Sequence, residues 1–113
     1  MPPVEITLNE GLFVLRPSGG EDLTVQVSRD DLSGFLTRNT DRLPMLVDLA
    51  DLRILQSSGV GLLFFLLIEA EKASIPVGFI NASELVAKIL SIAGVSDLAK
   101  IYPDERTARE NLL

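Results

Sequence analysis

The stretch that decides the fold is residues 47–61, VDLADLRILQSSGVG. It begins within the apolar run PMLVDL (residues 44–49), which has the length and composition of a central strand buried on both faces. A polar loop follows, and from about Ser58 to Ala73 the pattern is that of a helix with glycines in its first turn. A buried strand that leads through a loop into a helix indicates an α/β fold.

Shorter elements are predicted before this stretch. Residues 4–8 and 12–15 read as two strands of a hairpin, with Gly11 supplying the turn conformation. Residues 23–27, LTVQV, alternate and are rich in β-branched side chains, which predicts an extended segment. At Ser28 the pattern turns helical, because Ser28 can cap a helix whose first turn is acidic.

The alternation of predicted strands and helices continues after residues 47–61. Residues 75–80 have the pattern of another buried strand. Ser83 is expected to cap a helix that stops at Gly94. Residues 100–102 are predicted to form a short edge strand, and residues 103–105 open a last helix.

Length and composition indicate one globular domain. The chain has 113 residues, of which 47% are apolar and 23% charged, so it can build its own core. Together with the order of strands and helices, this predicts a single α/β domain over residues 1–113. Its sheet is expected to be mixed, mostly parallel and covered by helices.

Missing residue types exclude several kinds of chemistry. The chain has no Cys and no His, so it can have no disulfide, no thiolate nucleophile, no imidazole base and no sulfur-ligated zinc. No nucleophile–base pair and no glycine-rich phosphate loop is recognisable. We therefore expect a protein that is not an enzyme and has no catalytic residues, no cofactor and no metal site.

The charge and the apolar runs argue against nucleic acid and membranes as partners. Ten basic residues against sixteen acidic ones give a net charge of −6, which repels phosphate backbones and anionic lipid. Residues 1–5 lack the basic and apolar regions of a signal peptide. The longest apolar run, residues 60–68, is much shorter than the roughly 20 residues of a membrane-spanning helix. We expect a soluble, cytoplasmic protein.

A pair of hydroxyls lies where the predicted central helix begins. Ser57 or Ser58 falls next to the unpaired amides and the positive dipole end of that helix. Either serine could act as an ordinary N-cap, and a phosphate placed there would be held by backbone N–H groups. The residue types alone leave both interpretations open.

Residues 48–61, DLADLRILQSSGVG, resemble the signature of the STAS domain family, and particularly that of bacterial anti-sigma factor antagonists. The family pattern is Asp-Leu, a spacer, an apolar residue, and then Asp-Ser-Ser/Thr-Gly-Leu-Gly. Residues 19–22, GGED, lie at the family's Gly-x-Leu-Asp, and residues 75–80 and 93–98 resemble its later segments. The sequence departs from the pattern at Gln56, which replaces an Asp, and at Glu21, which replaces an apolar residue.

The resemblance implies a partner-switching protein. In the family, an anti-sigma factor that is an ATP-dependent serine kinase phosphorylates the first serine of the pair, and a phosphatase reverses the modification. The unphosphorylated form binds the anti-sigma factor and frees the sigma factor. Carried over, this makes Ser57 the phosphoacceptor, with Ser58 less favoured, and it places Asp22 at the edge that faces the partner.

The predicted helix after the serines carries more apolar residues than one core-facing stripe can hide. On a helical wheel with 100° per residue, the expected core face is made by Val60, Leu63, Leu66, Leu67 and Ala70. Phe65 and Ile68 fall outside it, at about 140° and 80° from Val60. Either a neighbouring element covers them, or they form an exposed docking patch near Ser57. The expected partner-binding residues are Asp22, Gln56, Ser57, Ser58, Gly59, Phe65 and Ile68.

Two alternatives accompany this hypothesis. The replacement of the family Asp by Gln56 favours a STAS-type scaffold that binds its partner constitutively, without phosphorylation. A receiver domain with Asp48 as phosphoacceptor would need an acid pair and a late lysine, and residues 16–18 and 81–83 supply neither. The sequence leaves open whether the chain forms a homodimer.

Overall fold

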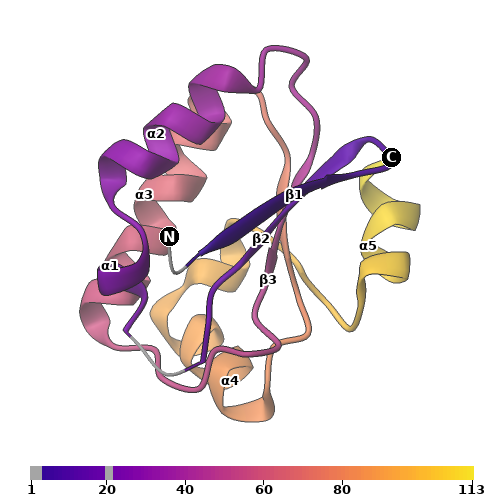
Figure 1. Ribbon diagram of the computed structural model, residues 1–113. Coiled ribbons are helices and arrows are strands. Elements are labelled where there is room, and N and C mark those ends of the chain that lie inside the picture. Colours follow the sequence, from indigo (N-terminus) through magenta and orange to yellow (C-terminus); the bar gives the residue numbers. More distant parts are fainter. Residues whose placement is uncertain (1–3, 20–21) are drawn as a thin grey trace.

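In the part of the chain that the structure describes, five strands form one sheet in the order β1-β2-β3-β4-β5 (Figure 1). The computed structural model describes residues 4–19 and 22–113, so Gly20 and Glu21 of the family-like motif lie outside the described residues. The first strand pairs antiparallel with the second, and all later neighbours pair in parallel. The predicted mixed, mostly parallel sheet is confirmed. The strands are β1 Glu5–Asn9, β2 Leu12–Arg16, β3 Met45–Asp48, β4 Val77–Ile80 and β5 Ile101–Tyr102.

Helices cover the two faces of the sheet unequally. In Figure 1, α1 to α4 lie on one face and α5 lies on the other. The bounds are α1 Leu23–Gln26, α2 Arg29–Arg38, α3 Ser57–Lys72, α4 Glu84–Ala93, a 3₁₀ helix Val95–Asp97, and α5 Glu105–Leu112. The unequal cover divides the core into a large part under α1 to α4 and a small part under α5.

The central strand β3 is buried on both faces, as its unbroken apolar run predicts. Met45 and Val47 belong to the large core, whereas Leu46 packs in the small core with Ala108 of α5. Strand β4 lies beside β3 in the same sheet, and its Phe79 is fully buried. Both runs that the sequence assigns to the sheet interior therefore lie there.

The predicted hairpin is confirmed, and its turn has two residues. Glu10 and Gly11 both adopt positive φ angles, 46° and 87°. This is the signature of a type I′ turn, whose twist matches that of the flanking strands. Asn9 pairs with Leu12, and the register runs without a break to Glu5 opposite Arg16.

Residues 23–27 are not extended, which corrects the sequence-based prediction. Residues 23–26 form the short helix α1, in which Leu23 and Gln26 are buried while Thr24 and Val25 are exposed. Burial at a spacing of three residues is a helical pattern that resembles strand alternation over so short a segment. The Gln26 side chain also bonds the backbone of Ser18, accepting from its N–H and donating to its C=O. This tertiary anchor outweighs the weak β propensity of the segment.

The predicted helix ends are largely confirmed. Ser28 caps α2 and forms a capping box with Asp31, at 3.0 and 2.9 Å. Ser83 caps α4 by accepting from the Val86 amide at 3.1 Å. Gly94 ends α4 with φ 86°, a conformation that glycine adopts without steric cost.

Candidate functional site

Helix α3 begins one residue earlier than the serine-capping interpretation expects. Gln56 is the N-cap residue, with φ −96° and ψ 172°, and its carbonyl accepts from the Val60 amide at 2.9 Å. Its side chain makes no capping hydrogen bond to the described part of the helix. Ser57 and Ser58 are therefore the first and second helical residues rather than caps, and both are exposed. The hydroxyls of Ser57 and Ser58 therefore lie at the positive end of a 16-residue helix without serving as its N-cap.

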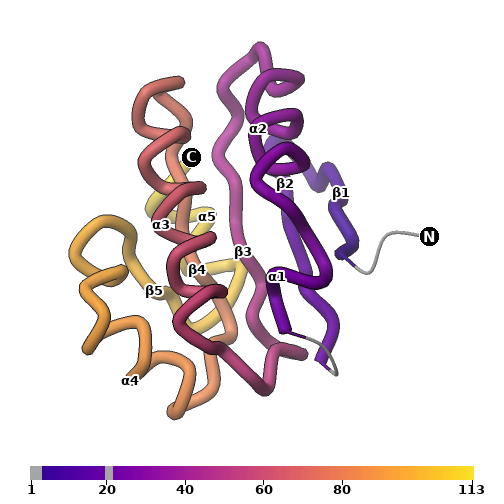
Figure 2. Tube along the Cα trace, turned by 90° about the vertical axis from the view of Figure 1, so that its left-hand side faces the viewer, coloured from indigo at the N-terminus to yellow at the C-terminus, as the bar shows by residue number. Residues whose placement is uncertain are grey.

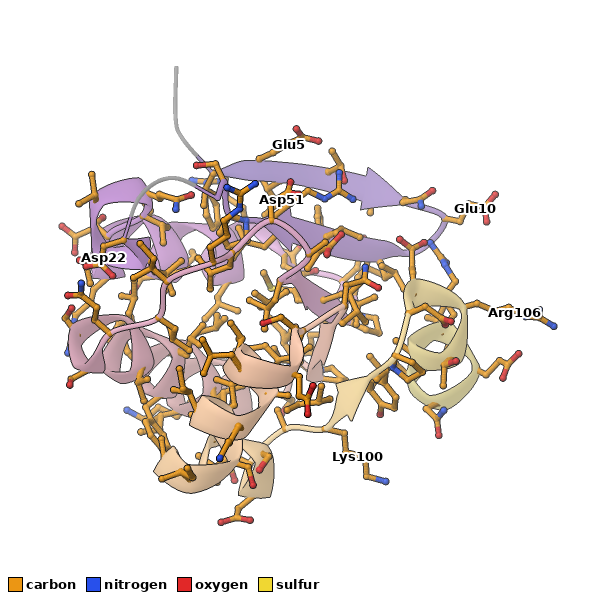
Figure 3. All side chains as sticks on the ribbon, turned by 90° about the horizontal axis from the view of Figure 1, so that it is seen from below. Glu5, Glu10, Asp22, Asp51, Lys100 and Arg106 are labelled. Atoms are coloured by element: carbon orange, nitrogen blue, oxygen red, sulfur yellow. The ribbon has the colours of Figure 1, made fainter. Side chains whose placement is uncertain are left out.

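Ser58 faces the segment that precedes α1. Its hydroxyl donates a long hydrogen bond of 3.4 Å to Oδ2 of Asp22, which also accepts from Thr24 Oγ1. The other oxygen of Asp22 is buried and has no hydrogen-bond partner among the described residues. The family-like Asp22 and Ser58 are thus brought together from distant parts of the sequence, and Figure 3 shows Asp22 beside the start of α3.

Gly59 allows α1 and α3 to approach each other closely. It is buried, and a Cβ atom added there would lie 3.0 Å from Leu55 Cδ1 and 3.4 Å from Leu23 Cβ. Gly61, two residues further along the helix, has nothing within 4 Å of such an atom. The first glycine of the motif therefore serves packing, which in turn positions Asp22 against Ser58.

Ser57 lies on the other side, along an open groove between α3 and α4. Its walls are Leu55, Gln56, Ser57, Val60, Ile89, Ile92 and Ala93. Ile92 is the most exposed large apolar residue of the described chain, with 77% of its surface accessible. The contribution of α4 to this groove was not predicted from the sequence. The available signal was that Leu85 and Ile92 lie off the apolar face made by the buried Val86 and Leu90.

The residues of α3 that are buried partly match the core face predicted from the helical wheel. Leu63, Leu66, Leu67 and Ala70 are buried as expected, but Leu62 is also buried and Val60 is only half-buried. The core arc is rotated from the predicted one because α1 and α2 pack against one flank of α3. Val60 is consequently left at the edge of the groove rather than at the centre of the core face.

Phe65 and Ile68 do not form one exposed patch. The Phe65 ring is half-buried and lies under the Arg29 guanidinium of α2, 4.9 Å from the ring centroid. Ile68 is exposed, about 60° away around the helix. Helix α2 therefore covers Phe65 in part, while Ile68 stays exposed.

Asp48, the phosphoacceptor of the receiver alternative, is buried and hydrogen-bonded at both carboxylate oxygens. Oδ2 accepts from Arg16 Nε at 2.9 Å, while Oδ1 accepts from the Ala50 amide at 3.0 Å and from Asn81 Nδ2 at 3.1 Å. Burial alone would raise the pKa of Asp48, but these donors outweigh it and hold the pKa below its usual range. The same hydrogen bond with Asp48 raises the pKa of Arg16. Asp48 thus joins the ends of β2, β3 and β4.

Within residues 4–19 and 22–113, no group of three or more acidic side chains is arranged to hold a metal ion. No helix in these ranges has the length and apolar character needed to cross a membrane. The candidate site is a surface made by the start of α3, the segment before α1, and α4.

Comparisons with known proteins agree with this fold and motif. The family model of the STAS domain matches residues 4–108, so the chain belongs to the STAS domain family. Comparison with curated protein sequences finds no match.

Solved structures, among them those of anti-sigma factor antagonists, have the same fold. TM1081 of Thermotoga maritima is 16% identical over 96% of this chain and 93% of its own, with a TM-score of 0.84. The S58E variant of RsbS from Moorella thermoacetica is 15% identical over 99% and 96%, with a TM-score of 0.75. The Bacillus cell-fate determinant SpoIIAA, solved in its phosphorylated form, is 17% identical over 97% and 99%, with a TM-score of 0.66. SpoIIAA is itself an anti-sigma factor antagonist.

Proposed function

We propose that this chain is an anti-sigma factor antagonist controlled by reversible phosphorylation of Ser57. In its unphosphorylated form it binds an anti-sigma factor through the start of α3 and the groove between α3 and α4. That partner, or another serine kinase, phosphorylates Ser57, and a phosphatase restores the binding form. The protein acts in the cytoplasm by association and catalyses no reaction itself. The observation that carries the proposal is that Ser57 is exposed at the first position of α3 and lines an apolar groove.

The surroundings of the two serines favour Ser57 over Ser58 as the phosphoacceptor. A phosphate on Ser58 would lie against the Asp22 carboxylate, whose Oδ2 is 3.4 Å from the Ser58 hydroxyl. Two anionic groups at that distance repel each other. A phosphate on Ser57 would add about −1.5 to −2 charges at the positive end of α3, where the fold tolerates an anion.

The groove explains how this modification would control binding. Leu55, Val60 and Ile92 supply apolar surface on which a partner side chain can be buried. A phosphate at the rim would have to lose its water when the partner docks, and no basic residue lines the groove among the described residues to compensate it. Phosphorylation is therefore expected to weaken binding without destabilising the fold.

Gln56 is the observation that favours the second candidate function. A neutral amide stands here where the family has a carboxylate, directly before the phosphoacceptor. A kinase that recognises that carboxylate would phosphorylate this chain slowly or not at all. The chain would then be a scaffold that binds its partner constitutively through the same surface.

One experiment separates the two functions. The chain is incubated with ATP and each serine-kinase anti-sigma factor of the source organism, and the product is examined by intact mass and peptide mapping. We expect one phosphate on Ser57, none on the Ser57→Ala variant, and normal phosphorylation of the matched control Ser58→Ala. A phosphate on another residue would contradict the assignment of the site.

Binding is then measured by calorimetry with the same partner. Ser57→Ala should bind like the unmodified protein, and Ser57→Asp should bind at least about tenfold more weakly. Equal affinities of the two variants, with no phosphate transferred, would leave only the constitutive scaffold.

A further inference from the structure

Among the residues that the structure describes, the outer edge of β1 is an unpaired strand edge. In that part of the chain β1 has a strand neighbour only on the side of β2, and all five of its residues, Glu5–Asn9, are exposed. Proteins normally protect such edges with lysine, proline or a bulge. Residues 5–9 contain no lysine or proline, their one charged residue is Glu5 at the start of the strand, and the register with β2 has no bulge. This strand can therefore accept another strand along its full length.

The turn determines which backbone groups point outward. In a two-residue turn, the Asn9 carbonyl accepts from the Leu12 amide, so this pair is hydrogen-bonded. Hydrogen-bonded and non-hydrogen-bonded pairs alternate along an antiparallel ladder. Thr7 is therefore bonded to β2, whereas the N–H and C=O groups of Ile6 and Leu8 point away from the sheet.

Two apolar side chains accompany these outward backbone groups. Ile6 and Leu8 lie on the same face of β1, with 36% and 60% of their surface exposed. They line a shallow apolar cavity together with Phe13 of β2 and Phe35 of α2. A strand added at this edge would find both backbone partners and an apolar contact there.

We infer that two copies of this chain pair through β1, antiparallel, about a two-fold axis at Thr7. In this register Thr7 lies opposite Thr7 as a non-hydrogen-bonded pair. Ile6 of one copy lies opposite Leu8 of the other, so the outward backbone groups are satisfied. The four apolar side chains form one cluster on the side of the sheet that α2 covers. Glu5 lies opposite Asn9, so no like charges face each other.

The chain thereby forms a continuous ten-stranded sheet across two copies, held by five residues from each. This contact is smaller than the 1,200–2,000 Å² or so of stable specific interfaces, so the dimer is weak and concentration-dependent. Figure 3 shows Glu5 and Glu10 at the two ends of the β1 edge, and Figure 2 shows α4 on the opposite side of the molecule. Both Ser57 sites stay open in the dimer, so the inference is independent of the proposed function.

Charge substitution at the two-fold axis tests the register. Sedimentation of the full chain over a range of concentrations should show a reversible monomer–dimer equilibrium. Thr7→Lys and Thr7→Glu should each abolish the dimer, because like charges then meet across the axis. Mixing the two variants should restore a dimer, since a lysine then lies opposite a carboxylate. The matched control Thr40→Lys, in an exposed turn, should dimerise like the parent.

Crosslinking tests the same axis by geometry. Non-hydrogen-bonded pairs have Cα atoms about 4.5 Å apart, within the range that a disulfide spans. The chain has no cysteine of its own, so Thr7→Cys introduces a single thiol. Under mild oxidation it should form a covalent dimer at least about tenfold faster than Thr40→Cys. A monomer at every concentration, dimerisation unaffected by charge at Thr7, or equal crosslinking of the two cysteine variants would each overturn the inference.

Discussion

Replacing Asp48 by Asn should destabilise the fold by removing the charge that joins three strand ends. One orientation of the introduced amide keeps an oxygen toward the Ala50 amide but turns its NH₂ group toward the Arg16 guanidinium, donor against donor. The opposite orientation places the NH₂ group against the donors of Ala50 and Asn81. In both, at least one of the hydrogen bonds at 2.9 to 3.1 Å is lost.

The change in the free energy of unfolding depends on how exposed the Asp48 and Arg16 side chains are. A hydrogen bond to a charged group contributes about 1.5–3 kcal/mol when both partners are buried. The Asp48 side chain is 5% exposed, but that of Arg16 is 43% exposed and can turn toward water. The neutral amide also avoids the cost of burying a charge. We therefore expect Asp48→Asn to lower the free energy of unfolding by about 1–2 kcal/mol at pH 7.

The pH dependence provides the sharper test. Because the folded pKa of Asp48 lies below its unfolded value of about 3.9, the carboxylate stabilises the fold above that pH. This contribution is lost as the pH falls through the folded pKa. The difference between parent and Asp48→Asn should be constant from pH 7 to about pH 5 and shrink below about pH 4.

Urea unfolding followed by circular dichroism at a series of pH values measures this difference, with Asp41→Asn, in an exposed turn, as the control. A difference at pH 7 below about 0.5 kcal/mol, or one that grows on acidification, would refute the assigned role of Asp48.

Three further predictions concern the site. Gln56→Asp should raise the free energy of unfolding by about 1 kcal/mol in urea melts, because the Gln56 side chain does not cap α3 and a carboxylate can; no gain would show that the first-turn amides are already satisfied. Gly59→Val should cost about 1–3 kcal/mol by forcing α1 away from α3, whereas Gly61→Val, with open space around it, should cost less than about 0.5 kcal/mol. Ile92→Ala should weaken calorimetric binding to the anti-sigma factor about five- to thirtyfold, the loss of about 1–2 kcal/mol for a side chain that is 77% exposed before docking. Leu85→Ala, on the same helix but outside the groove, should bind the anti-sigma factor normally. If Ile92→Ala and Leu85→Ala change the affinity equally, the partner does not bind in this groove.

Sequence alone determined those features that depend on neighbouring residues. The apolar runs at 44–49 and 75–80 have no polar face, so only a position inside a sheet could bury them, and both strands lie there. Ser28, Ser83 and Gly94 mark helix ends because capping is a matter of a few adjacent backbone groups. The serine pair was located in the same way, from a strand, a loop and a helix start in one continuous stretch.

Only the tertiary structure decided what comes together from distant segments. Over only five residues, 23–27, the alternation of a strand cannot be distinguished from the periodicity of a helix. The hydrogen bonds between the Gln26 side chain and the Ser18 backbone favour the helix. Asp48 lies at the end of β3, and its role depends on Arg16 at the end of β2 and on Asn81 directly after β4.

The different surroundings of Ser57 and Ser58 are also decided by the tertiary structure. They differ by about 100° around α3, which turns Ser58 toward Asp22 and Ser57 toward α4. Neither neighbour is close in sequence, and periodicity within one helix carries no information about which elements pack beside it. Long-range packing therefore decides what each side of the helix start faces.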